Sequence, residues 1–475
     1  MNELIISFTE KNEKHLYEQI YQHIKTEIVE GRMKKQEKLP STRALSLYLQ
    51  VSRSTVSLAY DQLLAEGYIE SRPGSGYYVN TLENLYKDTR VKKVAVHPKK
   101  EQNPGEKIVF SPVGVDLSQF PYRTWRKITR EVLSFEESLF TGGDAQGEYS
   151  LRSSIRKYLH AARGVNCTEE QIIIGAGNEY LLMLLQKLLG IHTKVAFENP
   201  TYLKAYRSFY DAGFPVKLIS MDKKGMKVTQ LEASGAQIAY VMPSHQYPTG
   251  IVMPIGRRLE LLSWADASPE RYVIEDDYDS EFRHKGKPIP SLQSTDSGDN
   301  VIYIGTFSKA VAPAIRVSYM VLPNSLLQRY RQQGSYLSAT VSRVDQRVLD
   351  AFMQGGFFER YLNRMRKVYR VKHDRLMSLL KPFEKRFRIT GEWAGLHLLL
   401  TAKDFVTEKE LIEQAATVGV RVFGMSENLV GQDEQIQQKA TIILGYAELT
   451  EQEMEKGVEL LQKVWIGDEK ERYNG

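Results

Sequence analysis

Two stretches of the chain place an amine and carboxylates at the ends of neighbouring predicted strands. The apolar run 272–274 ends at Glu275-Asp276-Asp277, and the apolar run 301–304 leads through a short Gly-Thr-Phe-Ser segment to Lys309. Buried parallel strands bring their carboxyl ends to one edge of a sheet. We therefore expect the Lys309 amine and the Asp276 carboxylate to meet at that edge.

This set of groups matches the requirements of pyridoxal 5'-phosphate, which needs a lysine amine, a carboxylate for its ring nitrogen and donors for its phosphate. Lys309 is the candidate amine and Asp276 the candidate partner of the ring nitrogen. Tyr278 lies two residues further along an extended segment, on the same face, and is the candidate for the phenolic oxygen. The candidate phosphate ligands are Thr306, Ser308 and Arg316. Alone, each motif also fits a solvated turn or an exposed strand end, and only the two together favour the cofactor.

A glycine-rich turn joins the predicted strand 172–174 to a predicted helix that covers 180–189. Such a turn exposes backbone N–H groups that can hold a phosphate at the start of the helix. The same pattern is typical of an ordinary tight turn. On residues alone the two interpretations are equally supported.

The first eighty residues predict three helices followed by a β-hairpin. Apolar residues four apart, from Leu16 to Ile28, give the first helix one buried stripe, and Ser52 caps a third helix over 53–64. Exposed side chains at the start of that helix are placed to enter a major groove, and the hairpin 67–79 is placed as a wing. The candidate DNA contacts on these two elements are Ser52, Arg53, Ser54, Thr55, Arg72, Gly74 and Gly76.

The charge balance alone does not decide for DNA, because basic and acidic residues are equal in number over 1–79. A small helical interaction domain with solvated basic residues is the alternative. Six basic residues nevertheless fall around the predicted contact face, and this distribution favours DNA. They are Lys34, Lys35, Lys38, Arg43, Arg53 and Arg72.

The segments 274–282 and 305–309, together with 39–43, 51–56 and 67–69, resemble the MocR/GabR family of bacterial regulators. In that family a GntR-type winged helix-turn-helix is fused to an aminotransferase-like domain. The resemblance implies a multidomain fold: a winged helix-turn-helix over 1–79, a flexible charged linker over 80–107, and an α/β pyridoxal-phosphate-dependent transferase domain of fold type I over 108–475, with a small C-terminal α+β subdomain.

The resemblance also implies roles for individual residues. Arg53 and Arg43 become the main DNA contacts, Tyr202 stacks on the cofactor ring, and the glycine-rich turn supplies phosphate-loop candidates Ala176, Gly177 and Asn178. Aminotransferases have Asn-Pro-Thr-Gly where this chain has Tyr247-Pro-Thr-Gly. The bond to the phenolic oxygen is therefore expected from His245, Gln246 or Tyr247.

The C-terminal part lacks a group that working aminotransferases of this fold carry, an arginine that binds the substrate carboxylate. No arginine stands between Arg421 and Arg472, and the stretch 423–428 supplies Glu427 instead. We therefore expect a transcription regulator rather than an enzyme, with pyridoxal phosphate or an amino compound as its effector. If pyridoxal phosphate itself is the effector, the target is vitamin B6 synthesis, as in the PdxR kind of regulator. The alternative is an aminotransferase with a DNA-binding appendage. The resemblance further implies a homodimer, head to tail, on double-stranded operator DNA.

Length and composition agree with these expectations. A chain of 475 residues with 42% apolar residues is typical of soluble globular proteins with two or three domains. The single cysteine excludes an internal disulfide, and nine histidines without paired spacing predict no metal site. Without a basic and then apolar start or a membrane-length apolar run, we expect a cytoplasmic protein.

Overall fold

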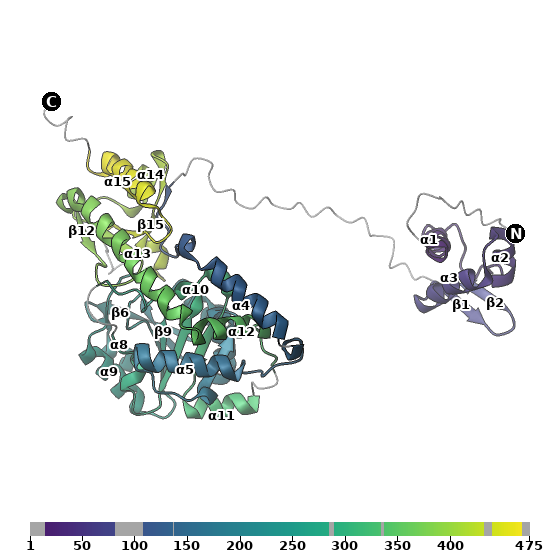
Figure 1. Ribbon diagram of the computed structural model, residues 1–475, viewed down its shortest axis with the longest axis horizontal. Coiled ribbons are helices and arrows are strands. Elements are labelled where there is room, and N and C mark those ends of the chain that lie inside the picture. The colour runs from purple at the N-terminus through teal and green to yellow at the C-terminus, as the bar shows by residue number, and fades with distance from the viewer. Residues whose placement is uncertain are drawn as a thin grey trace. The chain divides into compact units, whose positions relative to one another are not determined.

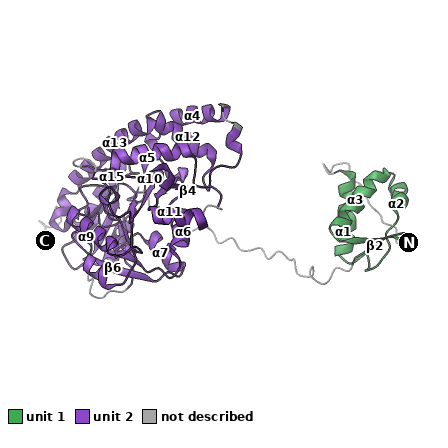
Figure 2. Ribbon diagram, turned by 90° about the horizontal axis from the view of Figure 1, so that it is seen from below, with its two compact units in different colours: residues 1–101 green, residues 102–475 purple. Residues whose placement is uncertain are grey.

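The computed structural model describes residues 15–80, 108–135, 137–284, 289–333, 337–431 and 439–467. The chain forms two compact units, residues 1–101 and 102–475, which Figure 2 colours separately. The expected linker, 80–107, lies outside the described residues apart from Asn80. Each unit is described by itself.

The small unit is a three-helix bundle with a hairpin (Figure 1). Its elements are α1 (Leu16–Val29), α2 (Thr42–Leu49), α3 (Arg53–Ala65), β1 (Ile69–Arg72) and the antiparallel β2 (Gly76–Val79). The predicted stripe on α1 is buried at Ile20, Ile24 and Ile28, whereas Leu16 at the first position of the helix is 46% exposed. The three helices and the hairpin thus agree with the prediction.

Local hydrogen bonds explain where α2 and α3 begin. The Ser41 hydroxyl accepts from the Ala44 N–H, and the Ser52 hydroxyl accepts from the Thr55 N–H, each at 3.1 Å. Both are N-caps, which satisfy an N–H group that the helix itself leaves free. The buried Tyr60 hydroxyl donates to the Pro40 carbonyl at 2.9 Å and so fixes α3 against the segment before α2.

The large unit is built on an eight-stranded sheet with strand order β4-β11-β10-β9-β8-β5-β6-β7. Its central strands are parallel, and β11 runs antiparallel to both β10 and β4. The strands are β4 (Ile172–Gly175), β5 (Val195–Asn199), β6 (Val216–Asp222), β7 (Gly225–Met226), β8 (Ile238–Val241), β9 (Tyr272–Asp277), β10 (Val301–Thr306) and β11 (Ser318–Val321).

Helices cover both faces of this sheet, which is why inner strands such as β8 and β10 read as continuous apolar runs. On one face Ile274 and Ile302 pack with α6 (Asn178–Leu189), α7 (Leu203–Asp211) and α11 (Asn324–Gln333). On the other face Val273 and Val301 pack with α8 (Val228–Ala233) and α9 (Ile255–Asp266). A further core joins α4 (Tyr122–Phe135), α5 (Tyr149–Arg163), α12 (Arg343–Gln354) and α13 (Phe357–Leu379), which lie side by side in Figure 1.

The predicted meeting of two strand ends is confirmed. Strands β9 and β10 pair in parallel, with Asp276 opposite Ile304 and Asp277 opposite Gly305. The chain then turns directly from β10 into the short helix α10 (Phe307–Ala310), which carries Lys309. The register therefore brings the acids of β9 and the start of α10 to the same edge.

A second, smaller sheet completes the large unit. Its strands are β12 (Phe387–Thr390), β13 (His397–Ala402), β16 (Thr441–Gly445) and β15 (Phe423–Gly424), in that order, and β14 (Val420–Arg421) pairs in parallel with β3 (Ile108–Val109). Helices α14 (Glu408–Thr417) and α15 (Glu451–Trp465) pack on it. The first strand of the large unit therefore belongs to its C-terminal subdomain.

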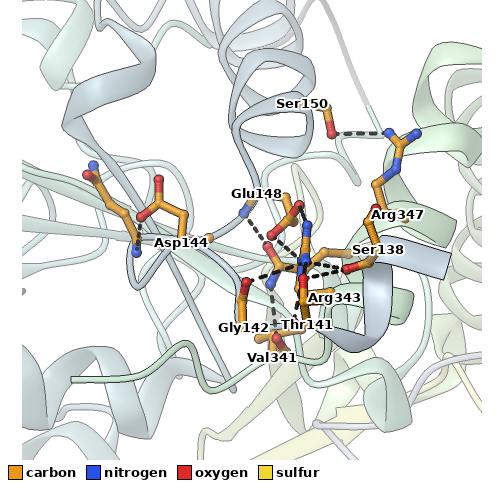
Figure 3. A network of polar contacts seen from close by, with 12 residues as sticks. Ser138, Thr141, Gly142, Asp144, Glu148, Ser150, Val341, Arg343 and Arg347 are labelled. Carbon is orange, nitrogen blue, oxygen red and sulfur yellow. Dashed lines mark hydrogen bonds and ion pairs between the residues drawn. The ribbon is translucent and has the colours of Figure 1, made fainter. Parts of the chain in front are cut away.

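An ionic network fixes the turn before α5 to the start of α12 (Figure 3). The Arg343 guanidinium donates to both carboxylate oxygens of Glu148, at 2.8 and 3.0 Å, and to the Ser138 carbonyl at 2.6 Å. Such a two-pronged pair is geometrically specific. The Gln346 side chain adds a bond from the Glu148 N–H at 2.8 Å.

A buried ion pair holds the segment that follows β3. The Lys372 ammonium on α13 donates to the Asp116 carboxylate and to the Ala447 carbonyl, both at 2.7 Å, and both charged side chains are about nine-tenths buried. The same segment carries Gly114, whose carbonyl faces Lys309.

In the described part of the chain, no helix is long and apolar enough to cross a membrane.

We expect Lys372→Met to lower the free energy of unfolding of the large unit by about 3 kcal/mol, because the buried Asp116 carboxylate loses its counter-charge. Urea unfolding followed by tryptophan fluorescence measures this, since all four tryptophans lie in the large unit. Lys409→Met is the matched control, because the Lys409–Glu413 pair is exposed and contributes little. Equal midpoints for the two variants would contradict a stabilising role of the buried pair.

Candidate functional site

A cavity of about 260 Å³ lies at the carboxyl ends of β9 and β10. Most of the residues predicted for the cofactor line it, although they come from distant parts of the sequence. These lining residues are Asn178, Tyr202, Tyr247, Asp276, Tyr278, Thr306, Ser308, Lys309 and Arg316. Of the predicted set, Ala176 and Gly177 do not line the cavity, and the Ala176 N–H donates to the Thr340 hydroxyl at 3.0 Å.

The alternation of side chains along β9 selects one of the three predicted acids. The Glu275 carboxylate accepts the N–H groups of Leu292 and Gln293, at 2.8 and 2.9 Å. Asp277 forms a buried ion pair with Arg163 of α5 at 2.8 Å. Asp276, on the opposite face of the strand, is the acid that lines the cavity.

Asp276 is a buried carboxylate whose hydrogen-bond donors are neutral. The Tyr240 hydroxyl donates to it, and the Asn178 amide donates at 3.2 Å. Burial raises the pKa of Asp276 to about 6, against the effect of these two donors. A protonated ring nitrogen would give this carboxylate the positive partner that its neighbours do not supply.

Lys309 stands at the first turn after β10, with Thr306 as the N-cap of α10. Its ammonium donates to the Gly114 carbonyl at 3.5 Å, a long contact. Burial lowers the pKa of Lys309 to about 8, while the carboxylates of Asp279 and Glu448 oppose the shift. A substantial fraction of the amine is therefore neutral, and hence nucleophilic, at mildly alkaline pH.

The three candidates for the phenolic-oxygen contact occupy different places. Tyr247 lines the cavity, with its ring edge-on to Tyr202 and Tyr278 at centroid distances of 6.1 and 6.2 Å. Gln246 lies in the turn, where its amide donates to the Pro200 carbonyl at 2.9 Å. His245 lies outside the lining and contacts the Tyr278 hydroxyl through Nδ1 at 2.8 Å. The geometry therefore favours Tyr247 for direct contact and gives His245 a position behind Tyr278.

Two buried polar atoms at the cavity have no hydrogen-bond partner among the described residues. The Ser308 hydroxyl and the Asn178 Oδ1 atom are buried and make no hydrogen bond in the described structure. Buried polar atoms are normally satisfied, so these two atoms mark places for a polar ligand. The Thr306 hydroxyl, in contrast, accepts from the Ser308 N–H at 3.1 Å and from the Ser318 hydroxyl at 2.9 Å.

The residues fit pyridoxal phosphate on these observations. A nucleophilic amine, a buried acid and unsatisfied polar atoms share one cavity of suitable size. Among the described residues, no cluster of three or more histidine, cysteine, aspartate or glutamate side chains is arranged to hold a metal ion.

Five of the lining residues were not predicted from the sequence: Pro112, Val113, Glu179, Lys204 and Met242. Glu179 follows the glycine-rich turn and lies in the first turn of α6. Its place in the sequence could therefore have indicated that it lies at the cavity. Pro112 and Val113 lie three and four residues after the end of β3, in a segment whose position at the cavity no local pattern indicates. Their placement depends on tertiary packing.

The small unit displays most of the predicted DNA contacts on its surface. Arg43, Arg53 and Ser54 are exposed, and the Arg53 Nε atom donates weakly to the Thr42 hydroxyl at 3.4 Å. The Ser52 hydroxyl is engaged as the cap of α3, at 2.7 Å from the Thr55 hydroxyl. Gly74 is exposed and Gly76 is half-buried at the turn of the hairpin.

Arg72 on the hairpin is more constrained than the other predicted contacts. Its guanidinium pairs with Glu70, bonds to the Gln36 amide oxygen and lies over the Tyr78 ring at 4.4 Å. The side chain would have to leave Glu70 to reach a phosphate group. Arg53 and Arg43 are the freer cations of this face.

Comparisons with known proteins agree with both units. The family model "Bacterial regulatory proteins, gntR family" matches residues 16–79, and "Aminotransferase class I and II" matches residues 115–461. Among solved structures, a kynurenine aminotransferase of Pyrococcus horikoshii has a TM-score of 0.67 at 25% identity, over 76% of this chain and 91% of that chain. An archaeal alanine:glyoxylate aminotransferase has a TM-score of 0.69 at 23% identity, with the same coverages.

Relatives that match over four-fifths of the chain or more are regulators by name. The HTH-type transcriptional regulator YhdI of Bacillus subtilis is 38% identical over 97% of this chain and 98% of its own length. The probable rhizopine catabolism regulatory protein MocR of Rhizobium meliloti is 30% identical, over 95% of this chain and 94% of its own. The pyridoxine biosynthesis regulator PdxR of Corynebacterium glutamicum is 30% identical, over 80% and 82%. With a GntR-type helix-turn-helix unit joined to an aminotransferase class I/II unit, the chain belongs to the MocR/GabR family of transcriptional regulators.

Proposed function

We propose that the large unit binds pyridoxal 5'-phosphate in the cavity at β9 and β10, and that this binding changes the affinity of the small unit for operator DNA. The observation that carries the proposal is the placement of the Lys309 amine and the Asp276 carboxylate in one cavity at adjacent strand ends. Such coupling between two sites is a free energy that both ligands share.

The proposed roles follow from the contacts of each residue. Lys309 attaches the aldehyde, Asp276 pairs with the ring nitrogen, and Tyr278 and Tyr247 hold the phenolic oxygen. Tyr202 packs against the ring, at the N-cap of α7. The side chains of Ser308, Thr306 and Arg316 receive the phosphate, together with the backbone N–H group of Asn178 at the start of α6. When bound, the cofactor supplies an aldehyde that combines reversibly with amines.

A sensor is favoured over an enzyme because the cavity provides poorly for a substrate carboxylate. Arg316 is the arginine of the lining, and it belongs to the phosphate end. Arg421, on the short strand β14, is exposed and lies near the Phe423 ring at 5.3 Å. Glu427 is close enough to Tyr247 to raise the pKa of that phenol further, beyond the larger effect of burial. Glu427 therefore places an acidic side chain in the stretch where an aminotransferase of this fold needs a basic residue to bind the substrate carboxylate.

The effector within this proposal is pyridoxal phosphate itself or an amine that reacts with it. The relative PdxR is named as a regulator of pyridoxine biosynthesis, which supports control of vitamin B6 synthesis as the target. An aminotransferase with a DNA-binding appendage is the alternative, and a purified protein that converts amino donors in catalytic turnover would favour it.

The proposed assembly is a homodimer, arranged head to tail, on double-stranded operator DNA. Two recognition helices then read two half-sites. At each half-site, Arg53 contacts a base edge and Arg43 contacts a phosphate or a base. Both arginines are exposed on the face that α2 and α3 present.

We expect Lys309→Ala to lose the long-wavelength absorbance band that the wild-type protein gains with pyridoxal phosphate, because the attacking amine is removed. Lys204→Ala is the matched control, since Lys204 also lines the cavity, and it should keep the band. A band that survives in Lys309→Ala and disappears in Lys204→Ala would show that the cofactor attaches to Lys204 and not to Lys309.

We expect the rate of pyridoxal phosphate capture to rise with pH through about 8, since the neutral amine is the reactive form. With the pKa of Lys309 near 8, about a tenth of the amine is neutral at pH 7 and about nine-tenths at pH 9. Stopped-flow absorbance between pH 6.5 and 9.5 measures the profile. A rate that still rises about tenfold per pH unit at pH 9.5, without a plateau, would mean an exposed lysine with an ordinary pKa of about 10.4.

We expect Arg53→Ala to weaken DNA binding by about 1–3 kcal/mol, the cost of losing one specific base contact. Gel-shift titration at fixed salt, on a duplex selected from a random pool with the wild-type protein, measures the change. Arg32→Ala is the control, because Arg32 pairs with Glu27 and Glu30 at the end of α1. Indistinguishable titrations of Arg53→Ala and wild type would contradict the assignment of α3 as the recognition helix.

A further inference from the structure

The phosphate end of the cavity holds a carboxylate of its own. Arg316 follows the 3-10 turn Pro313–Ile315 in a left-handed conformation, with φ of 50°. Its Nη2 atom lies 2.6 Å from the Glu179 carboxylate. Both side chains line the cavity and are about half exposed, at 52% and 47%. The arginine best placed for a phosphate is therefore already paired with an acid.

The pair lies directly over the first turn of α6. Gly177, the N-cap of this 12-residue helix, has φ of 93°. A Cβ atom on Gly177 would collide with the Arg316 guanidinium and would lie 3.1 Å from the Glu179 carboxylate. The two charged groups thus converge where the free N–H groups of a helix attract an anion.

The surroundings keep Glu179 ionised. Burial alone would raise the pKa of Glu179, but its own backbone N–H, Arg316 and Lys204 outweigh burial and lower it. A carboxylate so stabilised satisfies the same donors that a phosphate group requires. A phosphate that enters this end of the cavity meets a negative charge already in place.

We propose that Glu179 is a resident anion that competes with the phosphate of the ligand for Arg316 and for the start of α6. The proposal rests on the proposed function, because it assumes that a phosphorylated pyridoxal enters this cavity. The ligand must part Glu179 from Arg316, and that cost sets the concentration at which the protein responds. A ligand without a phosphate leaves the pair intact.

A purely structural role for Glu179 predicts the opposite effect. If the carboxylate only held Arg316 in place for the phosphate, its removal would loosen the guanidinium and weaken binding. Competition predicts tighter binding after removal, because the guanidinium is freed and a repelling charge is lost. The sign of the change therefore separates the two roles.

The test is a set of absorbance titrations with pyridoxal phosphate and with unphosphorylated pyridoxal, on wild-type protein, Glu179→Gln and Glu413→Gln. Glu413 is the matched control, because it is also a helical glutamate paired with a basic residue, Lys409, on the exposed face of α14. We expect Glu179→Gln to bind pyridoxal phosphate about tenfold more tightly, a gain consistent with one partly exposed charge pair and one repulsion removed. Pyridoxal affinity should stay unchanged in all three proteins.

A second measurement needs no attachment to Lys309. Inorganic phosphate should raise the melting temperature of Glu179→Gln at concentrations that leave the wild type unaffected, since a ligand stabilises the state it binds. Glu179→Ala should behave like Glu179→Gln. Circular dichroism of each variant confirms that it is folded before titration.

The possible results distinguish failure of the competition by Glu179 from failure of the proposed function. Equal or weaker binding of pyridoxal phosphate by Glu179→Gln and Glu179→Ala overturns the competition. A wild-type protein that gives no band with pyridoxal phosphate overturns the proposed function, and the melting experiment with inorganic phosphate then still decides whether Glu179 excludes an anion. A tenfold gain for both ligands alike would also contradict the proposal, because it would not involve the phosphate.

Discussion

The parallel pairing of β9 with β10 is the constraint on which the site depends. Backbone hydrogen bonds fix Asp276 opposite Ile304 and Asp277 opposite Gly305, so the acids of one strand and the turn into α10 share an edge. Burial of that edge then sets the chemistry, because it lowers the pKa of Lys309 to about 8 and raises that of Asp276 to about 6. An amine and an acid are thereby tuned in opposite directions within one cavity.

Much of this arrangement was predictable from the sequence, because it is encoded locally. Apolar runs that end in acids or in Ser-Lys mark buried strands, and the parallel sheet brings their ends together. The period of four along α1 and the cap Ser52 likewise predict two of the helices of the small unit. Leu16 differs, since a helix's first residue has no neighbouring turn to cover it, and it stays 46% exposed.

What the sequence did not determine are contacts that only packing creates. The choice among His245, Gln246 and Tyr247 depends on how the turn 245–250 folds. The Gln246 side chain accepts from Thr249 within that turn and donates to the Pro200 carbonyl outside it. Glu179 pairs with Arg316, 137 residues away, so no local pattern predicts the pair. The same holds for Gly114, which meets Lys309 because Lys372 anchors the segment through Asp116. The fold is that of an aminotransferase, but Glu179 lies at the phosphate end of the cavity and Glu427 lies close to Tyr247.

The most direct test of the central claim is chemical mapping of the attachment site. The full-length protein is incubated with pyridoxal phosphate, reduced with sodium borohydride to fix the linkage, digested and analysed by mass spectrometry. The account predicts one dominant labelled peptide, with the added mass on Lys309, and strong loss of that label in Asp276→Asn. A label on Lys204 or on scattered surface lysines, with Lys309 unmodified, would contradict it.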